Sequence, residues 1–167
     1  MIKAVIFDFD GTIIDTETAW YKVFKDAYQS YGVDLSLTTY SQCLGTSLHT
    51  FNPYTHLSTH HAIPIDLDEF RAMILQNYEK LIEQESMRPG ILNLLQEAKA
   101  AGLKIGLASS SHRDWIDKFV EKLSIRDYFE CYCTADTVTK VKPDPELYLQ
   151  ALEQLGVKSN EAIAIED

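Results

Sequence analysis

Apolar and polar positions alternate in two different ways along this chain. Residues 2–9 form a nearly continuous apolar run, which predicts a fully buried strand. Apolar residues at intervals of three and four then predict a helix that ends at Gly32, and a second helical pattern begins near Asp66 or Asp68. Residues 33–65, between the two patterns, show no regular period. The first helix has its apolar residues at Trp20, Val23, Phe24, Ala27, Tyr28 and Tyr31.

After Arg88-Pro89-Gly90 the pattern changes to short helices that alternate with short strands. Such alternation predicts a mainly parallel sheet covered by helices on both faces. We therefore expect an α/β core that is interrupted by a helical insertion over residues 16–82. The predicted helices are 91–101, 113–123 and the segment from Pro145 to Leu155, and the predicted strands are 103–108, 129–134 and 162–165.

Composition narrows the class of protein. The chain has 167 residues and a formal net charge of −10, with no basic block that would meet nucleic-acid phosphates. Its three cysteines are an odd number at spacings that do not predict a disulfide framework. No apolar run reaches membrane-spanning length, and Asp8 and Asp10 interrupt the apolar stretch near the N-terminus. These features predict a soluble cytoplasmic protein without nucleic-acid or membrane partners.

Two carboxylates, Asp8 and Asp10, come at the end of the first predicted strand and precede Gly11. In a strand, residues i and i+2 point the same way, so both side chains are expected to reach the same small space. Two anions held that close need a cation, or one of them must hold a proton. An Asx turn is the structural alternative. The D-x-D-G-T spacing after an apolar strand is more restrictive than such a turn and favours chemistry on a charged group.

Further polar residues fall at the ends of the other predicted strands. They are the serines 109–111, Asp136 with the loop 140–142, and the pair Glu166-Asp167. Ligands of open α/β sheets bind beyond the carboxyl ends of the strands, so these groups are expected to converge. Carboxylates there suit Mg²⁺, and a serine hydroxyl at a helix start suits phosphate oxygens. Taken singly, each signal is also typical of a helix cap, a solvated loop or a surface turn.

These residues, in this order, resemble the four motifs of the haloacid dehalogenase superfamily over essentially the whole chain. The insertion after the first motif resembles the helical cap of the branch that contains β-phosphoglucomutase and many sugar-phosphate phosphatases. The resemblance implies a Rossmann-like parallel sheet core over residues 1–15 and 83–167, with an all-helical cap over residues 16–82. The matching segments are Asp8-Phe9-Asp10-Gly11-Thr12, Ser109 after Gly106-Leu107-Ala108, Lys142 in Lys142-Pro143-Asp144-Pro145, and Glu166-Asp167.

The resemblance also implies a role for each acidic residue. Asp8 is expected to attack phosphorus and form an aspartyl phosphate. Asp10 is expected to protonate the leaving alcohol and then to deprotonate the attacking water. The expected ligands of Mg²⁺ are Asp8, the backbone carbonyl of Asp10 and Asp167, while Glu166 supports the ion directly or through water.

Three further residues are expected to hold the transferring phosphoryl group. By the same resemblance, the hydroxyl of Ser109 and the N–H of Ser110 bind its oxygens, and Lys142 neutralises its charge. This expectation agrees with the physical chemistry of phosphoryl transfer, which depends on positioning and charge stabilisation more than on elaborate covalent chemistry. A carboxylate nucleophile divides the hydrolysis into two easier steps.

Asp10 also narrows the reaction. Dehalogenase members of the superfamily lack the second aspartate, because a halide leaving group needs no proton. A mutase relative is expected to carry a histidine in the helix after the first motif and an arginine in the cap. Here Trp20 stands near the histidine position, and residues 44–48 contain no arginine. We therefore expect hydrolysis of a small phosphomonoester, a sugar phosphate in particular, with β-phosphoglucomutase-like phosphotransfer as the alternative.

Four cap positions are predicted to face the substrate: Glu17, Trp20, Thr46 and Ser47. Trp20 also lies on the apolar stripe of its predicted helix. A packing role in the cap core is therefore left open beside substrate contact for this residue. The identity of the phosphorylated metabolite depends on the packing of the cap and is not predicted from the sequence.

The end of the chain departs from the family pattern. The superfamily normally continues past the Glu-Asp pair with a further strand and helices, whereas this sequence stops at Asp167. Residues 162–165 are then expected to form an exposed sheet edge, which natural proteins avoid, and we interpret the chain as truncated. An intact protein is expected to be a monomer. The alternative is an inactive fragment that binds phosphate or recruits a complementing C-terminal segment.

Overall fold

A computed structural model of the chain describes residues 1–43 and 51–167, which divide into two compact units. The first unit consists of Met1–Asp15 and Ser86–Asp167, and the second of Thr16–Glu85. The second unit ends three residues after the predicted end of the cap at residue 82. Residues 83–85 stay with the second unit because their backbone N–H groups still donate to carbonyls in the last turn of its final helix.

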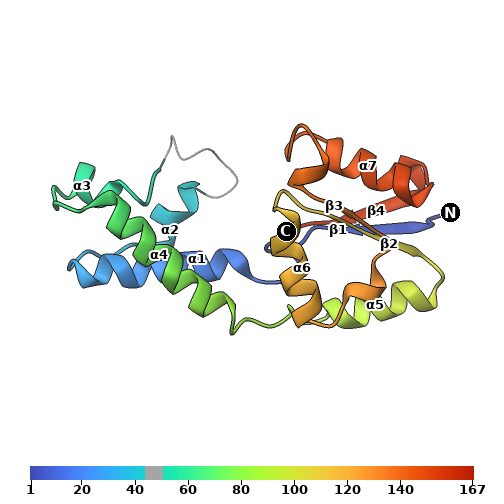
Figure 1. Cartoon of the computed structure of the whole chain (residues 1–167), viewed down its shortest axis with the longest axis horizontal. Coiled ribbons are helices and arrows are strands. Elements are labelled where there is room, and N and C mark those ends of the chain that lie inside the picture. The colour runs from blue at the N-terminus through green and yellow to red at the C-terminus, as the bar shows by residue number, and fades with distance from the viewer. Residues whose placement is uncertain (44–50) are drawn as a thin grey trace. The chain divides into compact units, whose positions relative to one another are not determined.

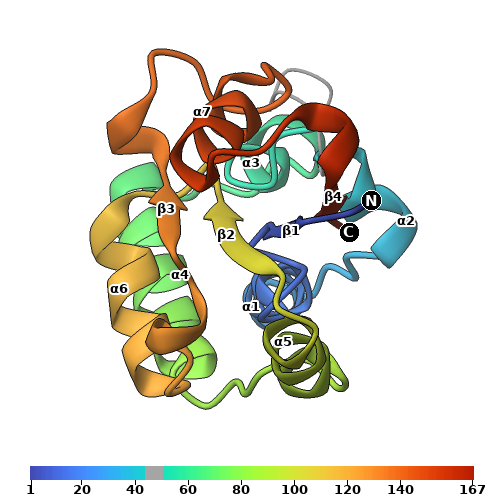
Figure 2. The same ribbon diagram turned by 90° about the vertical axis from the view of Figure 1, so that its right-hand side faces the viewer.

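The first unit is built on a four-stranded sheet whose neighbouring strands are all parallel, in the order β3-β2-β1-β4 (Figure 1, Figure 2). This arrangement confirms the predicted α/β fold. All four residues of the central strand β1 are buried. Phe7 at its end is in register with Leu107 and Ile165, so the carboxyl ends of three strands lie level with one another. The strands are β1 (Ala4–Phe7), β2 (Lys104–Ala108), β3 (Cys131–Cys133) and β4 (Ala162–Ile165).

Helices cover both faces of this sheet, as predicted. Helix α7 (Glu146–Leu155) lies on one face, and α5 (Ile91–Ala100) and α6 (Arg113–Lys122) lie on the other (Figure 1, Figure 2). The face under α7 is closely packed: a Cβ added at Gly106 would lie 2.9 Å from the sulfur of Cys131. The short 3₁₀ helices of this unit are η2 (Arg126–Tyr128), η3 (Ala135–Thr137) and η4 (Ser159–Glu161).

Strand β4 forms one edge of the sheet. In the described part of the chain it pairs with β1 alone, and Ile163 in its middle is 48% exposed. The predicted exposed edge at residues 162–165 is therefore present in this structure.

The second unit is helical, and its core is rich in aromatic rings. Trp20 stacks on Tyr78 with ring centroids 3.7 Å apart, which joins the two long helices α1 and α4. Asp66 caps α4 by accepting hydrogen bonds from the next turn, as the predicted start near Asp66 or Asp68 requires. The helices of this unit are α1 (Thr16–Ser30), α2 (Leu37–Tyr40), η1 (Ser41–Cys43), α3 (His56–His60) and α4 (Leu67–Ile82).

Residues 33–43 and 51–65 are more ordered than the sequence pattern indicates. Their helices α2, η1 and α3 are three to five residues long. Such helices complete little more than one turn, so no period can build up in the sequence. Across residues 1–43 and 51–167, no helix is both long and apolar enough to cross a membrane.

Candidate active site

The loop that follows β1 carries the two predicted catalytic carboxylates to the ends of the strands. The N–H of Asp8 donates to the carbonyl of Ile165 at 2.9 Å, so the pairing with β4 continues one residue past β1. Gly11 then adopts φ +80°, and a Cβ at this position would collide with the carboxylate of Asp167. Position 11 thus requires glycine, and the loop lies directly against Asp167.

Asp8 is bound by a lysine from a distant part of the chain. The Nζ of Lys142 lies 2.6 Å from Oδ1 of Asp8 and 2.5 Å from Oε1 of Glu166. It also lies 5.0 Å from the ring centroid of Tyr148, close enough for a cation–π contact. The Asp8 side chain is only 11% exposed, so this ion pair is largely withdrawn from water. One ammonium group is therefore shared by two carboxylates and an aromatic face.

Burial and the lysine act on these two carboxylates in opposite directions. Desolvation raises the pKa of Asp8, although the Lys142 ammonium works against the rise. Desolvation also raises the pKa of Glu166, but the Lys142 ammonium 2.5 Å away outweighs it, so the net pKa of Glu166 is lowered. The charge around Asp8 thus does not fully offset its burial, and further positive charge would stabilise the ionised form of its carboxyl group.

Asp10 is held by neutral donors instead of a cation. Its Oδ1 accepts a hydrogen bond from Nε1 of Trp115 at 3.0 Å. Its Oδ2 accepts one from Oγ of Ser111 at 2.6 Å and a longer one from Oγ of Ser109 at 3.3 Å. The two aspartates are close enough to interact electrostatically, but they take separate partners. The expectation that both reach one small space is therefore only partly correct. The alternation of a strand ends with β1 at Phe7, and Asp10 lies in the turn that follows.

Residues 109–111, called the serine bridge below, lie between β2 and α6. The N–H of Ser109 donates to the carbonyl of Cys133 at 2.9 Å, which extends the pairing of β2 with β3. Ser109 itself is almost completely buried, and its Oγ accepts the N–H of Ser111 at 3.0 Å. Beyond the bridge, Asp136 accepts the first N–H of α6, from Arg113, at 2.6 Å. This contact gives Asp136 the role of a helix cap from outside the helix.

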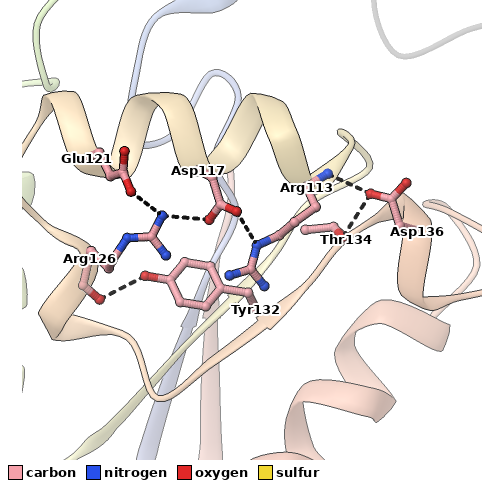
Figure 3. A network of polar contacts seen from close by, with 7 residues as sticks. All are labelled: Arg113, Asp117, Glu121, Arg126, Tyr132, Thr134 and Asp136. Carbon is pink, nitrogen blue, oxygen red and sulfur yellow. Dashed lines mark hydrogen bonds and ion pairs between the residues drawn. The ribbon is translucent and has the colours of Figure 1, made fainter.

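A network of ion pairs anchors the whole of α6 to the segment between α6 and β3 (Figure 3). Asp117 accepts from Arg113 at 3.0 Å and from Arg126 at 2.9 Å. The hydroxyl of Tyr132 donates to the carbonyl of Arg126 at 2.8 Å, and the guanidinium of Arg113 lies 4.6 Å from the centroid of the Tyr132 ring. Exposed ion pairs are individually weak, but their connection through Asp117 fixes the helix that carries Trp115.

The structure distributes the other predicted residues between the two units. Ser110 lies in the serine bridge with an exposed side chain. Glu17 and Trp20 lie in the first turns of α1 in the second unit, where Trp20 takes the packing position on Tyr78. Substrate contact by Glu17 and Trp20 stays a prediction. Thr46 and Ser47 lie outside the described residues.

Sequence reasoning missed three residues around the aspartates: Ser111, Trp115 and Tyr148. Ser111 belonged to the recognised serine triplet, but spacing alone did not distinguish it from Ser109 and Ser110. Trp115 and Tyr148 lie on helices whose apolar pattern indicates packing, and both rings do pack, Trp115 against Phe119. Their polar atoms reach the aspartate region only because α6 and α7 begin beside the carboxyl ends of β2 and β3.

The described residues contain no group of three or more His, Cys, Asp or Glu side chains arranged to hold a metal ion. Mg²⁺ does not need such a group, because it takes one or two carboxylates and completes its shell with water and phosphate oxygens. Asp8 lies on the loop after β1, the carboxylate of Asp167 lies against Gly11 of that loop, and burial raises the pKa of Asp8. This donor set fits a small, hard divalent cation.

The fold and the site define a protein of the α/β class with carboxylates at the ends of its parallel strands. The family model of the haloacid dehalogenase-like hydrolases matches residues 5–167. The chain therefore belongs to the haloacid dehalogenase-like hydrolase family.

Individual relatives match the chain over its whole length. The YhcW protein of Bacillus subtilis (strain 168) is 41% identical over 167 residues, which is 100% of this chain and 76% of the relative. The phosphorylated carbohydrates phosphatase of Thermotoga maritima is 27% identical over 99% of this chain and 76% of its own length. Among solved structures, CbbY from Rhodobacter sphaeroides in complex with phosphate matches with a TM-score of 0.68 and 26% identity, over 100% of this chain and 78% of that chain.

Proposed function

We propose that this chain is a Mg²⁺-dependent phosphatase that hydrolyses a small phosphomonoester through an aspartyl phosphate on Asp8. The observation that carries the proposal is the buried carboxylate of Asp8, held 2.6 Å from the ammonium of Lys142 at the carboxyl end of the central strand. A buried anion beside a cation is suited to attack a group that is itself negatively charged, because the cation offsets the repulsion. Membership of the hydrolase family supports the same reaction.

In the first step, a carboxylate oxygen of Asp8 forms a bond to phosphorus while the bond from phosphorus to the ester oxygen breaks. Asp10 gives its proton to that oxygen, so the alcohol leaves as a neutral molecule. Lys142 balances the charge on the phosphoryl oxygens, and Ser109 with the N–H of Ser110 binds them. General acid catalysis of this kind is worth a factor of about 10²–10⁴ in rate.

In the second step, Asp10 takes a proton from water, and the water oxygen bonds to phosphorus. The bond between phosphorus and the Asp8 oxygen then breaks, which releases inorganic phosphate and restores the Asp8 carboxylate. Mg²⁺ would be held by Asp8, the backbone carbonyl of Asp10 and Asp167, with Glu166 in support, and when bound it neutralises charge on the phosphate oxygens. Asp10 thus acts first as an acid and then as a base.

The proposed substrate class is a phosphorylated sugar in the cytoplasm. One relative is named as a phosphatase of phosphorylated carbohydrates, and one matching structure holds phosphate. Cys43, Cys131 and Cys133 are all free thiols, which suits a reducing compartment. Glu17, Trp20 and Thr46 are the proposed substrate contacts of the second unit.

Trapping of the phosphorylated protein tests this proposal. The chain is mixed with Mg²⁺ and a panel of sugar phosphates and other phosphomonoesters, quenched in acid and examined by intact mass spectrometry. We expect a single added phosphoryl group that maps to the peptide with Asp8 and that is absent with chelator. The Asp8→Asn variant is the control and should stay unmodified. Phosphate release that persists in Asp8→Asn, with deamidation excluded, would contradict the proposal.

A further inference from the structure

Both carboxylate oxygens of Asp10 are bound by one short stretch of chain, residues 109–115. The indole of Trp115 donates to Oδ1 at 3.0 Å, and the hydroxyl of Ser111 donates to Oδ2 at 2.6 Å. Trp115 is half-buried, and its ring packs against Phe119 at 4.5 Å between centroids. Since α6 is itself tied down by Asp136 and Asp117, the indole N–H has a fixed position relative to Asp10.

The two sides of Asp10 differ in what they can do chemically. An indole N–H is a donor only, whereas a serine hydroxyl can donate or accept. While the hydrogen bond from Trp115 persists, Oδ1 of Asp10 must remain an acceptor. Oδ2 has neighbours that can rotate and accept, namely the hydroxyls of Ser109 and Ser111. A proton that enters or leaves the carboxyl group is therefore directed to Oδ2.

We propose that Trp115 is a positioning residue that orients Asp10 for acid–base catalysis by reserving Oδ1 as an acceptor and leaving Oδ2 to carry the transferred proton. This inference rests on the proposed function, because it concerns the proton that Asp10 is proposed to transfer. Without the indole N–H, the carboxyl group can rotate, and the proton is delivered to the leaving oxygen in a smaller fraction of encounters.

The leaving group provides a test that a loss of packing would not imitate. The variant Trp115→Phe keeps an aromatic ring beside Phe119 but removes the N–H. Its kcat/KM is compared with that of the natural chain for glycerol 2-phosphate, whose alkoxide needs a proton, and p-nitrophenyl phosphate, whose nitrophenolate does not. Because kcat/KM reports the steps up to alcohol release, we expect a loss of about 10-fold for the first substrate. This is less than the roughly 10²–10⁴-fold of general acid catalysis, because Asp10 itself remains. For the second we expect little change.

Matched variants separate positioning from general damage. Tyr132→Phe also removes one donor from an aromatic ring of the first unit, where the Tyr132 hydroxyl bonds a backbone carbonyl. This variant is expected to leave unchanged the ratio of kcat/KM for glycerol 2-phosphate to kcat/KM for p-nitrophenyl phosphate. Ser111→Ala should lower the ratio as Trp115→Phe does, and Ser111→Thr, which keeps a hydroxyl, should restore it. Equal losses with both substrates in Trp115→Phe would overturn the proposal. If Trp115→Phe does not fold, the Ser111 pair provides the same comparison.

A fluorescence measurement tests the contact without any turnover. The chain has two tryptophans, so Trp20→Phe leaves Trp115 as the only indole emitter. In that background Asp10→Ala should shift the emission of Trp115, whereas Asp127→Ala, which removes an exposed carboxylate of the same unit, should not. An unchanged emission in Asp10→Ala overturns the inference. If the emission shifts but the natural chain hydrolyses neither substrate, the contact is supported and the proposed function is contradicted, so the two failures can be told apart.

Discussion

Asp8 and Asp10 are separated by one residue, yet the surroundings of the two carboxylates are different in kind. Asp8 is paired with the ammonium of Lys142, which it shares with Glu166. Asp10 is surrounded by the neutral donors Ser111 and Trp115. The same functional group thereby has two different surroundings, because a cation favours the ionised form of a carboxyl group, whereas hydroxyl groups can donate or accept as a proton is gained or lost. The environment, and not the residue type, distinguishes the proposed nucleophile from the proposed acid.

The largest expected effect is at the nucleophile. Asp8→Asn removes the proposed nucleophile, so kcat should fall by a factor on the order of 10⁴ or more for every phosphomonoester. Steady-state phosphate release from an alkyl and a nitrophenyl ester measures this loss. If the loss depended strongly on the leaving group, the proposed division of roles between Asp8 and Asp10 would be wrong.

Asp10→Ala should show the opposite selectivity. Its kcat/KM for alkyl phosphates is expected to fall by about 10²–10⁴, since the alkoxide no longer receives a proton. For p-nitrophenyl phosphate the loss in kcat/KM should be much smaller. Asp114→Ala, which removes an exposed carboxylate from the first turn of α6, is the control and should change neither value. Equal losses with both esters in Asp10→Ala would assign Asp10 a structural role.

Lys142→Gln tests the positive charge beside Asp8 and leaves the donors to Asp10 unchanged. Gln can still donate hydrogen bonds but carries no charge, so the phosphoryl oxygens and Asp8 lose their counter-charge. We expect kcat to fall by about 10²–10³, as when one preorganised electrostatic donor is removed. Lys140→Gln makes the same change in the same loop at an exposed site 3.8 Å from Asp144 and should keep full activity. Similar losses of activity in the two variants would show that Lys142 has no special role in the reaction.

The smallest effect is expected in the ion-pair network that holds α6 and, through it, the donors to Asp10. Hydrogen bonds from Arg113 and Arg126 lower the pKa of Asp117 below its ordinary value of 3.8. A lowered folded-state pKa adds stability above pH 3.8, and this contribution disappears as pH falls through the lower value. Urea unfolding should therefore show Asp117→Asn to be less stable than the natural chain at pH 7, with the difference shrinking toward pH 3. A difference that stayed constant with pH would contradict the ion-pair explanation.

Much of the fold was predictable because its signals are local. The apolar run before Asp8 predicts a buried strand, Pro145 marks the start of α7, and Asp66 marks the start of α4; each signal acts within a few residues. The short helices α2 and α3 were not predictable, since a single turn carries no period. Within the serine bridge, the sequence could not tell Ser110 from Ser111, because side-chain direction there depends on how the loop leaves β2.

By itself, the sequence determined that two carboxylates, a serine segment, a lysine loop and an acidic pair would meet at the ends of parallel strands. That outcome follows from the order of strands and loops, which periodicity and turn residues specify. Only the tertiary structure decided which partner each carboxylate takes. Lys142 reaches Asp8 across 134 positions of sequence, and Trp115 reaches Asp10 across 105. Contacts at such separations depend on the order of the strands in the sheet, which no local pattern of residues encodes.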